Sequence, residues 1–179
     1  MKKFIPLLFF QCLLAQSFVE FDLNKSFISY DGKHPAHNWT GISKDIRGAF
    51  EINEKDLTQS TVDLFVPVFS FDSKNANRDS NMLDVVEEYF YPFVRFTSSK
   101  IKKSESGFDV VGNLNFHGIT KEFTIPVELN KDNESILVTS DFSIMLTDFK
   151  IKRPALLTIK IRNQVDIKVY LVGSIENQK

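Results

Sequence analysis

Hydrophobic and polar residues alternate with a period of two along four stretches of the chain. Within each stretch, charged, amide or other polar residues occupy most of the positions between the apolar ones. The apolar sets are Val19, Phe21 and Leu23; Phe108, Val110, Gly112, Leu114 and Phe116; Phe123, Ile125, Val127 and Leu129; and Val165, Ile167, Val169 and Leu171. This period is typical of β-strands with one apolar face and one solvated face.

Further strands are predicted where β-branched and aromatic residues are concentrated. These stretches are residues 26–30, 46–52, 61–71, 93–103, 135–144 and 157–161. The stretch 61–71 is apolar on both faces, with Phe65, Phe69 and Phe71 opposite a row of aliphatic residues. Such a strand is either covered on both sides or lines a cavity on one of them.

One short helix is predicted between a cap at Asp79 or Ser80 and a stop at Pro92. Its apolar residues at helical spacing are Met82, Val85, Val86 and Tyr89. A second helical turn is predicted to begin at Pro154 and to include Leu156. The chain is therefore expected to be all-β, an antiparallel barrel or sandwich with one inserted helix.

A closed barrel of about eight strands has room inside for one small ligand. Outer-membrane barrels have the reverse arrangement, with apolar residues facing the lipid. The chain has no aromatic girdles in recurring register, and residues 175–179 are mostly polar. The pattern therefore favours a barrel whose apolar face points inward.

The first residues resemble an export signal. Two lysines precede an apolar run over residues 4–15, and Ala15 and Ser17 are small residues at the spacing of a cleavage site. A lipoprotein anchor at Cys12 is disfavoured by its bulky neighbours. We therefore predict a signal peptide over residues 1–17, a single domain over residues 18–179, and a periplasmic or secreted location.

Composition narrows the function. The chain has 22 Lys and Arg against 23 Asp and Glu, and this near-neutral balance argues against a nucleic-acid partner. Cleavage after Ser17 would remove the only cysteine, so that neither a disulfide nor a thiolate site is expected. The 18 phenylalanines are the unusual feature, because they exceed what closing a core of this size requires.

Residues 112–127 read GNLNFHGITKEFTIPV, and three further elements stand in a fixed order around them. These are Ser26, Ile28 and Tyr30; Gly48 and Phe50; and YPFVRFTS at residues 91–98. Together they resemble the YceI-like polyisoprenoid-binding family. The resemblance implies an exported, lipocalin-like eight-stranded β-barrel that holds a long apolar chain, such as an isoprenoid quinone or a fatty-acyl lipid. Where that family has R-x-D-F-G, this chain has Asp148, Phe149 and Lys150.

The predicted ligand is apolar, because burying each CH₂ contributes about 0.8 kcal/mol without polar contacts. Residues 32–40 and 145–156 are expected to gate the mouth. The residues predicted to line the cavity are Phe21, Trp39, Phe50, Phe65, Phe69, Phe71, Phe96, Leu114, Phe116, Ile125 and Val127. For each phenylalanine taken singly, core packing is the alternative role.

Two other function classes stay open. An enzyme acting on such lipids would use His117, or His34 and His37, but no nucleophile elbow, phosphate loop or zinc-protease helix is present. A ligand-free scaffold barrel is the third hypothesis. No enzyme activity, metal site or cofactor other than the bound lipid is predicted, and transient membrane contact and a homodimer are left open.

Overall fold

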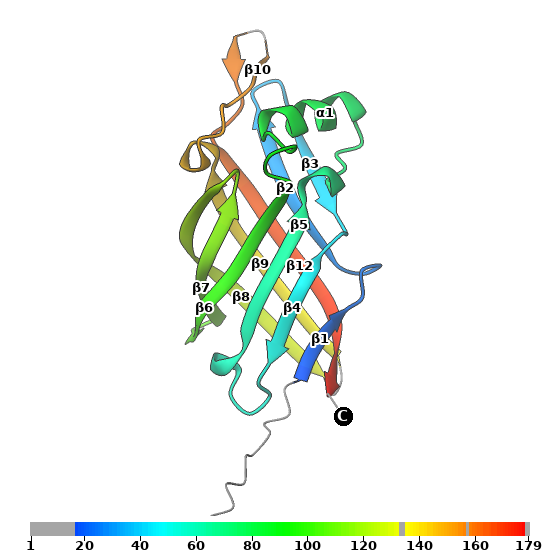
Figure 1. Cartoon of the computed structure of the whole chain (residues 1–179), viewed down its shortest axis with the longest axis vertical. Helices are drawn as coiled ribbons and strands as arrows, with labels where there is room; N and C mark the ends of the chain where they lie inside the picture. The colour runs from blue at the N-terminus through cyan, green and yellow to red at the C-terminus, as the bar shows by residue number, and fades with distance from the viewer. Residues whose placement is uncertain (1–16, 133–134, 157, 178–179) are drawn as a thin grey trace, which may run out of the picture.

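Eight antiparallel strands form a closed ring (Figure 1) in this computed structural model, which describes residues 17–132, 135–156 and 158–177. In order of hydrogen-bonded neighbours the ring consists of β1 (Ser17–Phe21), β4 (Arg47–Ile52), β5 (Thr61–Pro67), β6 (Phe93–Ser104), β7 (Gly107–Phe116), β8 (Ile119–Asp132), β9 (Ser135–Met145) and β12 (Gln164–Asn177). Pairing of β12 with β1 closes it. The predicted closed antiparallel barrel is confirmed, whereas the predicted signal peptide lies, apart from Ser17, outside the described residues.

A β-hairpin extends the wall beside the ring. It consists of β2 (Phe27–His34) and β3 (His37–Ser43), and β2 pairs with the part of β12 that β1 leaves free. Residues 32–40, which are expected to gate the mouth, are therefore mostly paired strand and not an irregular loop, and gating itself stays a prediction. Pro35 lies in a two-residue turn between paired His34 and His37, so the apparent break in the pattern is only the tip of a hairpin.

The helix α1 (Ala76–Val85) covers one end of the barrel, which we call the helix end (Figure 1). It begins earlier than predicted, because the Asn75 side chain accepts a hydrogen bond from the Arg78 backbone N–H and forms the cap. Asp79 does not cap the helix, since its carboxylate accepts hydrogen bonds from the Ser73 backbone and hydroxyl. The predicted cap at Asp79 or Ser80 is wrong.

The helix also stops before the predicted end at Pro92. Glu87 has a φ of 51°, in the left-handed region, which ends the helical backbone just after Val86. The segment that follows turns outward, so that Tyr89 is 87% exposed instead of lying on the apolar face.

Short elements complete both ends. They are η1 (Leu57–Gln59), η2 (Val68–Ser70), η3 (Leu146–Phe149), β10 (Ala155–Leu156) and β11 (Ile159–Lys160). The helical turn predicted from Pro154 is wrong, because β10 and β11 pair as a two-stranded ribbon around Thr158, whose φ is 75°. Of the strand predicted over residues 157–161 the structure has β11, and residue 157 lies outside the described residues.

A β-bulge in β6 directs Lys100 and Lys102 to the outside of the barrel. The pairing with β7 shifts between Ser98 and Lys100, which leaves Ser99 as an extra residue. A one-residue shift exchanges the two faces of a strand. Phe96 before the bulge and Ile101 after it therefore both point inward, while Lys100 is exposed.

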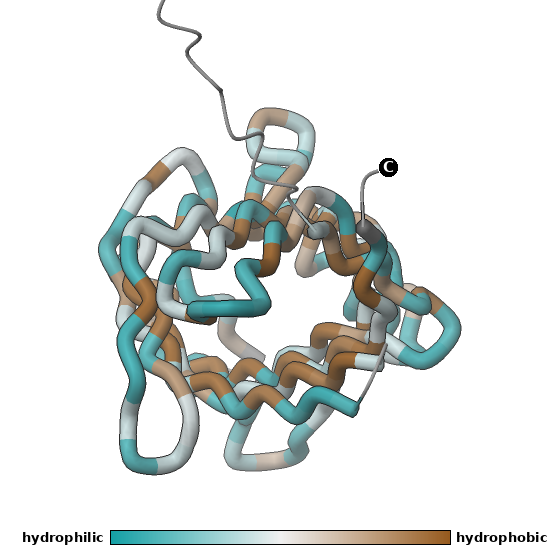
Figure 2. Tube along the Cα trace, turned by 90° about the horizontal axis from the view of Figure 1, so that it is seen from below, coloured by the Kyte–Doolittle hydropathy of each residue, from teal (hydrophilic) through white to brown (hydrophobic). Residues whose placement is uncertain are grey.

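The alternating positions sort into an apolar interior and a polar exterior. Viewed along the barrel, the trace runs around a central space with hydrophobic and hydrophilic positions alternating (Figure 2). Ile125 on β8 is buried, while its neighbour Thr124 is exposed. This polarity is the reverse of the arrangement in which apolar residues face lipid. Among the described residues, no helix has the length and apolar character needed to cross a bilayer.

Candidate functional site

The barrel encloses a cavity of about 570 Å³, and its lining is predominantly apolar. This volume lies within the roughly 300–1,000 Å³ of small-molecule sites in proteins. All eight strands of the ring contribute lining residues. Nine of the eleven predicted residues line it: Phe21, Trp39, Phe50, Phe71, Phe96, Leu114, Phe116, Ile125 and Val127.

Phe65 and Phe69 were wrongly placed in this lining. Phe65 packs against Phe93 on the outside with ring centroids 5.3 Å apart, and Phe69 is 58% exposed. The predicted strand over residues 61–71 ends at Pro67, and the 3₁₀ turn η2 follows. The turn changes the alternation, so Phe71 faces the cavity although Phe65 does not.

Several residues that line the cavity were not predicted, although the alternation of apolar and polar residues in their strand was sufficient to identify them. The apolar face of β12, made by Val165, Ile167, Val169 and Leu171, lines the cavity in full. Its alternation identified the strand, and the same alternation was sufficient to name the inward face. Arg78 also lines the cavity, but no periodic signal pointed to it, because α1 is positioned only by the tertiary fold.

Two aromatic side chains from the β2–β3 hairpin lie over glycines. Trp39 covers Gly32, and Tyr30 covers Gly41, where any Cβ would clash with the ring. In each case the two residues are cross-strand partners. A side chain on either glycine would push an aromatic ring away, so the two glycines fix where Tyr30 and Trp39 lie in the cavity.

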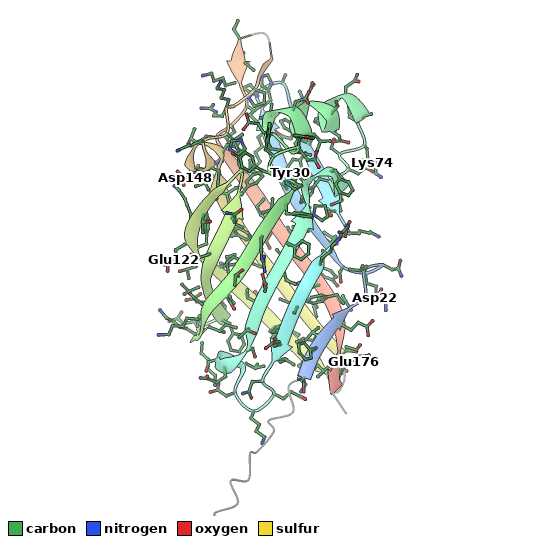
Figure 3. All side chains as sticks on the ribbon, in the orientation of Figure 1. Asp22, Tyr30, Lys74, Glu122, Asp148 and Glu176 are labelled. Atoms are coloured by element: carbon green, nitrogen blue, oxygen red, sulfur yellow. The ribbon has the colours of Figure 1, made fainter. Side chains whose placement is uncertain are left out.

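Tyr30 has a buried hydroxyl with no hydrogen-bond partner among the described residues. Leaving such a group unpaired costs about 1–3 kcal/mol. Burial raises the pKa of Tyr30, and the nearby Trp39 indole opposes that shift without reaching hydrogen-bond geometry. The ring is held edge-on against Phe71 at 5.5 Å. Figure 3 shows Tyr30 near the helix end of the barrel.

Arg78 is placed at the helix end by two kinds of contact. Its Nε and Nη2 donate hydrogen bonds to the hydroxyl and carbonyl of Ser73, at 2.8 and 2.6 Å. Its guanidinium lies 5.6 Å from the centre of the Trp39 ring, within the range of a cation–π contact. Among the described residues that line the cavity, Arg78 is the one with a permanent charge.

The opposite end of the cavity is apolar. Phe21, Phe50 and Leu57 lie there with β-branched neighbours. The serines in this part of the lining are already occupied, because Ser60 accepts a hydrogen bond from the Asn53 N–H and Ser140 donates one to the Pro126 carbonyl. A ligand tail would meet no unpaired polar group of the described residues there.

The three histidines do not form one site. His34 accepts the Ala36 N–H at Nδ1, while its Nε2 lies 3.2 Å from the Ile159 carbonyl. His37 lines the mouth of the cavity. His117 contacts the Phe149 carbonyl at 2.7 Å and the Glu87 carboxylate at 2.9 Å, and it does not line the cavity. The described residues hold no group of three or more His, Cys, Asp or Glu side chains placed to bind a metal.

Fold and cavity together define a closed antiparallel β-barrel with a hollow apolar interior. A model of the YceI-like domain family matches residues 19–173, so the chain belongs to that family. The family resemblance found in the sequence is confirmed.

Similar proteins support this assignment. A UPF0312 protein of Yersinia enterocolitica is 32% identical over 109 residues, and Protein YceI of Escherichia coli O17:K52:H18 is 30% identical over 107 residues. Each match covers 58% of this chain and 56% of the relative, so the chain aligns with about half the length of the curated relatives it matches.

Solved structures show the same fold. BcnA of Burkholderia cenocepacia is 23% identical with a TM-score of 0.77, over 86% of this chain and 99% of that one. A polyisoprenoid binding domain from Saccharophagus degradans, implicated in plant cell wall breakdown, is 15% identical with a TM-score of 0.70, over 90% and 99%. At these identities the likeness concerns the fold alone.

Proposed function

We propose that this protein is an exported carrier that holds one long apolar isoprenoid or fatty-acyl chain inside its barrel. The observation that carries the proposal is the cavity of about 570 Å³ inside the barrel with its predominantly apolar lining. Transfer of an alkyl chain into such a space contributes about 0.8 kcal/mol for each CH₂, before the costs of ordering the chain. The structural neighbour named a polyisoprenoid binding domain supports the same ligand class.

The enzyme hypothesis has less support. Both ring nitrogens of His117 are already in contact with Phe149 and Glu87 outside the cavity, and both nitrogens of His34 are occupied by backbone groups. His37 lines the mouth with its ring against those of His34 and Trp39, and no hydroxyl or thiol of the described residues is hydrogen-bonded to it. We therefore propose binding without chemical conversion.

Trp39 provides the test, because it is the only tryptophan in the chain and lines the cavity. Titration with geranylgeraniol or hexadecanol should change its fluorescence and saturate at one ligand per chain. The ligand should then be recovered with an unchanged mass. Trp39 fluorescence that does not change with added ligand contradicts the proposed carrier function. A modified ligand whose formation is lost in His117→Gln, or in a variant lacking His34 and His37, supports the enzyme instead.

Export is part of the proposal and rests on residues 1–17. Amino-terminal sequencing of protein from the periplasm or the medium should begin at Phe18. Intact chain confined to the cytoplasm would contradict it. The proposed contact with membranes and the proposed homodimer stay predictions.

A further inference from the structure

The cavity has one polar end, which is also its open end. The lining residues that are exposed to solvent are His37, Asn75, Asn81, Pro154 and Ala155. They come from the β2–β3 hairpin, from α1 and its cap residue, and from the start of the β10–β11 ribbon, all of which lie at the helix end (Figure 1). A ligand therefore enters or projects there, and the apolar opposite end receives whatever part is inserted first.

The charged side chain that lines this end is a cation with no direct ion pair among the described residues. Arg78 forms no ion pair with a described carboxylate, and no Asp or Glu lines the cavity. The nearby Asp79 carboxylate is directed to Ser73. Guanidinium carries five N–H donors, of which Ser73 takes two. Three donors are thus left for a group inside the mouth.

Tyr30 adds a second unused group beside the first. Its hydroxyl is buried and unpaired, and two charges act on it electrostatically: the Asp79 carboxylate raises its pKa and the Arg78 guanidinium lowers it. Trp39 lies beside both side chains. We call the region formed by Tyr30, Trp39 and Arg78 the polar corner. A hydroxyl that can donate, next to a cation, complements an oxygen that accepts hydrogen bonds and carries negative charge.

Resting on the carrier function above, we propose that the ligand is a single-chain amphiphile with an anionic oxygen head, bound head-outward at Arg78 and Tyr30. The head lies beside Trp39, and the tail extends along the interior past Phe96 to Phe50 at the opposite end. A carboxylate and a phosphate share this chemistry, and they are separated by the ligands used below.

Calorimetry with three ligands that share a 16-carbon chain and differ in the head group tests the specificity for the head. Wild-type protein should bind palmitate or hexadecyl phosphate about tenfold more tightly than hexadecanol, as expected for a hydrogen bond to a charged group. The tighter of the two anions identifies the head. Arg78→Met and Tyr30→Phe should each bring the ratio of anion affinity to hexadecanol affinity close to one. Arg95→Met, on the outside of β6, is the matched control and should leave this ratio unchanged.

Quenching of Trp39 tests the orientation. Palmitate brominated at carbon 2 should quench the indole strongly, and palmitate brominated at carbon 16 should quench it weakly. Stronger quenching by the tail bromine overturns the proposed orientation. Equal affinity for all three heads, unaffected by Arg78→Met, overturns the head site and leaves the carrier intact. Failure of every ligand to bind, hexadecanol included, contradicts the carrier itself.

Discussion

The two ends of the barrel interior differ in how they are closed. The opposite end is closed by the barrel's own residues, with Val19, Phe50, Ile52 and Ile136 buried in one apolar cluster. The helix end is only partly covered, by α1, the β2–β3 hairpin and the β10–β11 ribbon, which bring polar and solvent-exposed residues into the lining. This difference supports the proposal that the apolar end holds the tail of a ligand, while the polar end discriminates between head groups.

The helix end also contains the largest fully buried side chain among the described residues, Phe149. Phe149 is fully buried, stacked on Phe123 at 6.2 Å and tilted against Phe116 at 5.6 Å. We expect Phe149→Ala to lower the free energy of unfolding by about 3–5 kcal/mol, because it leaves a cavity in a packed cluster. Urea denaturation measures this. Phe69→Ala, at an exposed position nearby, should cost less than about 0.5 kcal/mol. Equal losses would contradict the packing described here.

At the opposite end, blocking the tail should reduce affinity in a way that depends on chain length. Val138 on β9 lines the cavity there, whereas its neighbour Leu137 does not. Val138→Trp would displace about three methylenes, so the affinity for the longest bound chains should fall by about 2.4 kcal/mol, or roughly 50-fold. Short chains should be unaffected. Leu137→Trp is the control. A loss of affinity in Val138→Trp that is the same for short and long chains would argue against a tail at this end.

An ion pair on the outer surface fastens the hairpin of the helix end to β12. Lys33 lies 2.6 Å from Asp166, and together with Ser143 and Gln164 it lowers the pKa of the Asp166 carboxyl to about 2. A carboxyl with a lowered pKa stabilises the fold above its ordinary pKa near 3.8, and that contribution is lost as the pH falls towards 2.

Because both side chains are partly solvated, we expect Asp166→Asn to cost only about 1 kcal/mol at pH 6. The difference between wild type and variant should shrink as the pH falls from 5 to near 2. Urea midpoints across that range measure it, and a difference that does not change with pH would contradict the assignment.

The smallest effect is expected at Lys150, which ends η3 with a φ of 57°. It stands at the glycine position of the family's D-F-G element, and left-handed backbone is costly for a residue with a Cβ. Lys150→Gly should raise the free energy of unfolding by less than about 1 kcal/mol, because the extra freedom of glycine in the unfolded chain offsets part of the gain. Lower stability in thermal denaturation would contradict this.

The walls of the barrel could be predicted from the sequence, because their apolar period persists over whole strands, as in β12. The positions of the pieces added at the helix end could not be predicted in this way. Pro35 interrupts the pattern in the same way whether it lies in a loop or at a hairpin tip. A single 3₁₀ turn after Pro67 separates Phe71 from Phe65, and local sequence does not reveal such a turn.

The polar corner was the least predictable part of the site. Tyr30 and Arg78 are distant along the chain and meet only because α1 folds over the hairpin. Neither residue is unusual for its element, since tyrosine is common in strands and arginine is common in helices. Such a site becomes visible only when burial and partners are known.

The most direct test of the central claim is native mass spectrometry of the full chain, produced in a bacterial host and purified without detergent. The carrier predicts a population heavier than the bare polypeptide by the mass of one lipid, and extraction should identify an isoprenoid or acyl chain. Protein with only the bare mass, which also takes up neither geranylgeraniol nor palmitate when these are supplied, would contradict it.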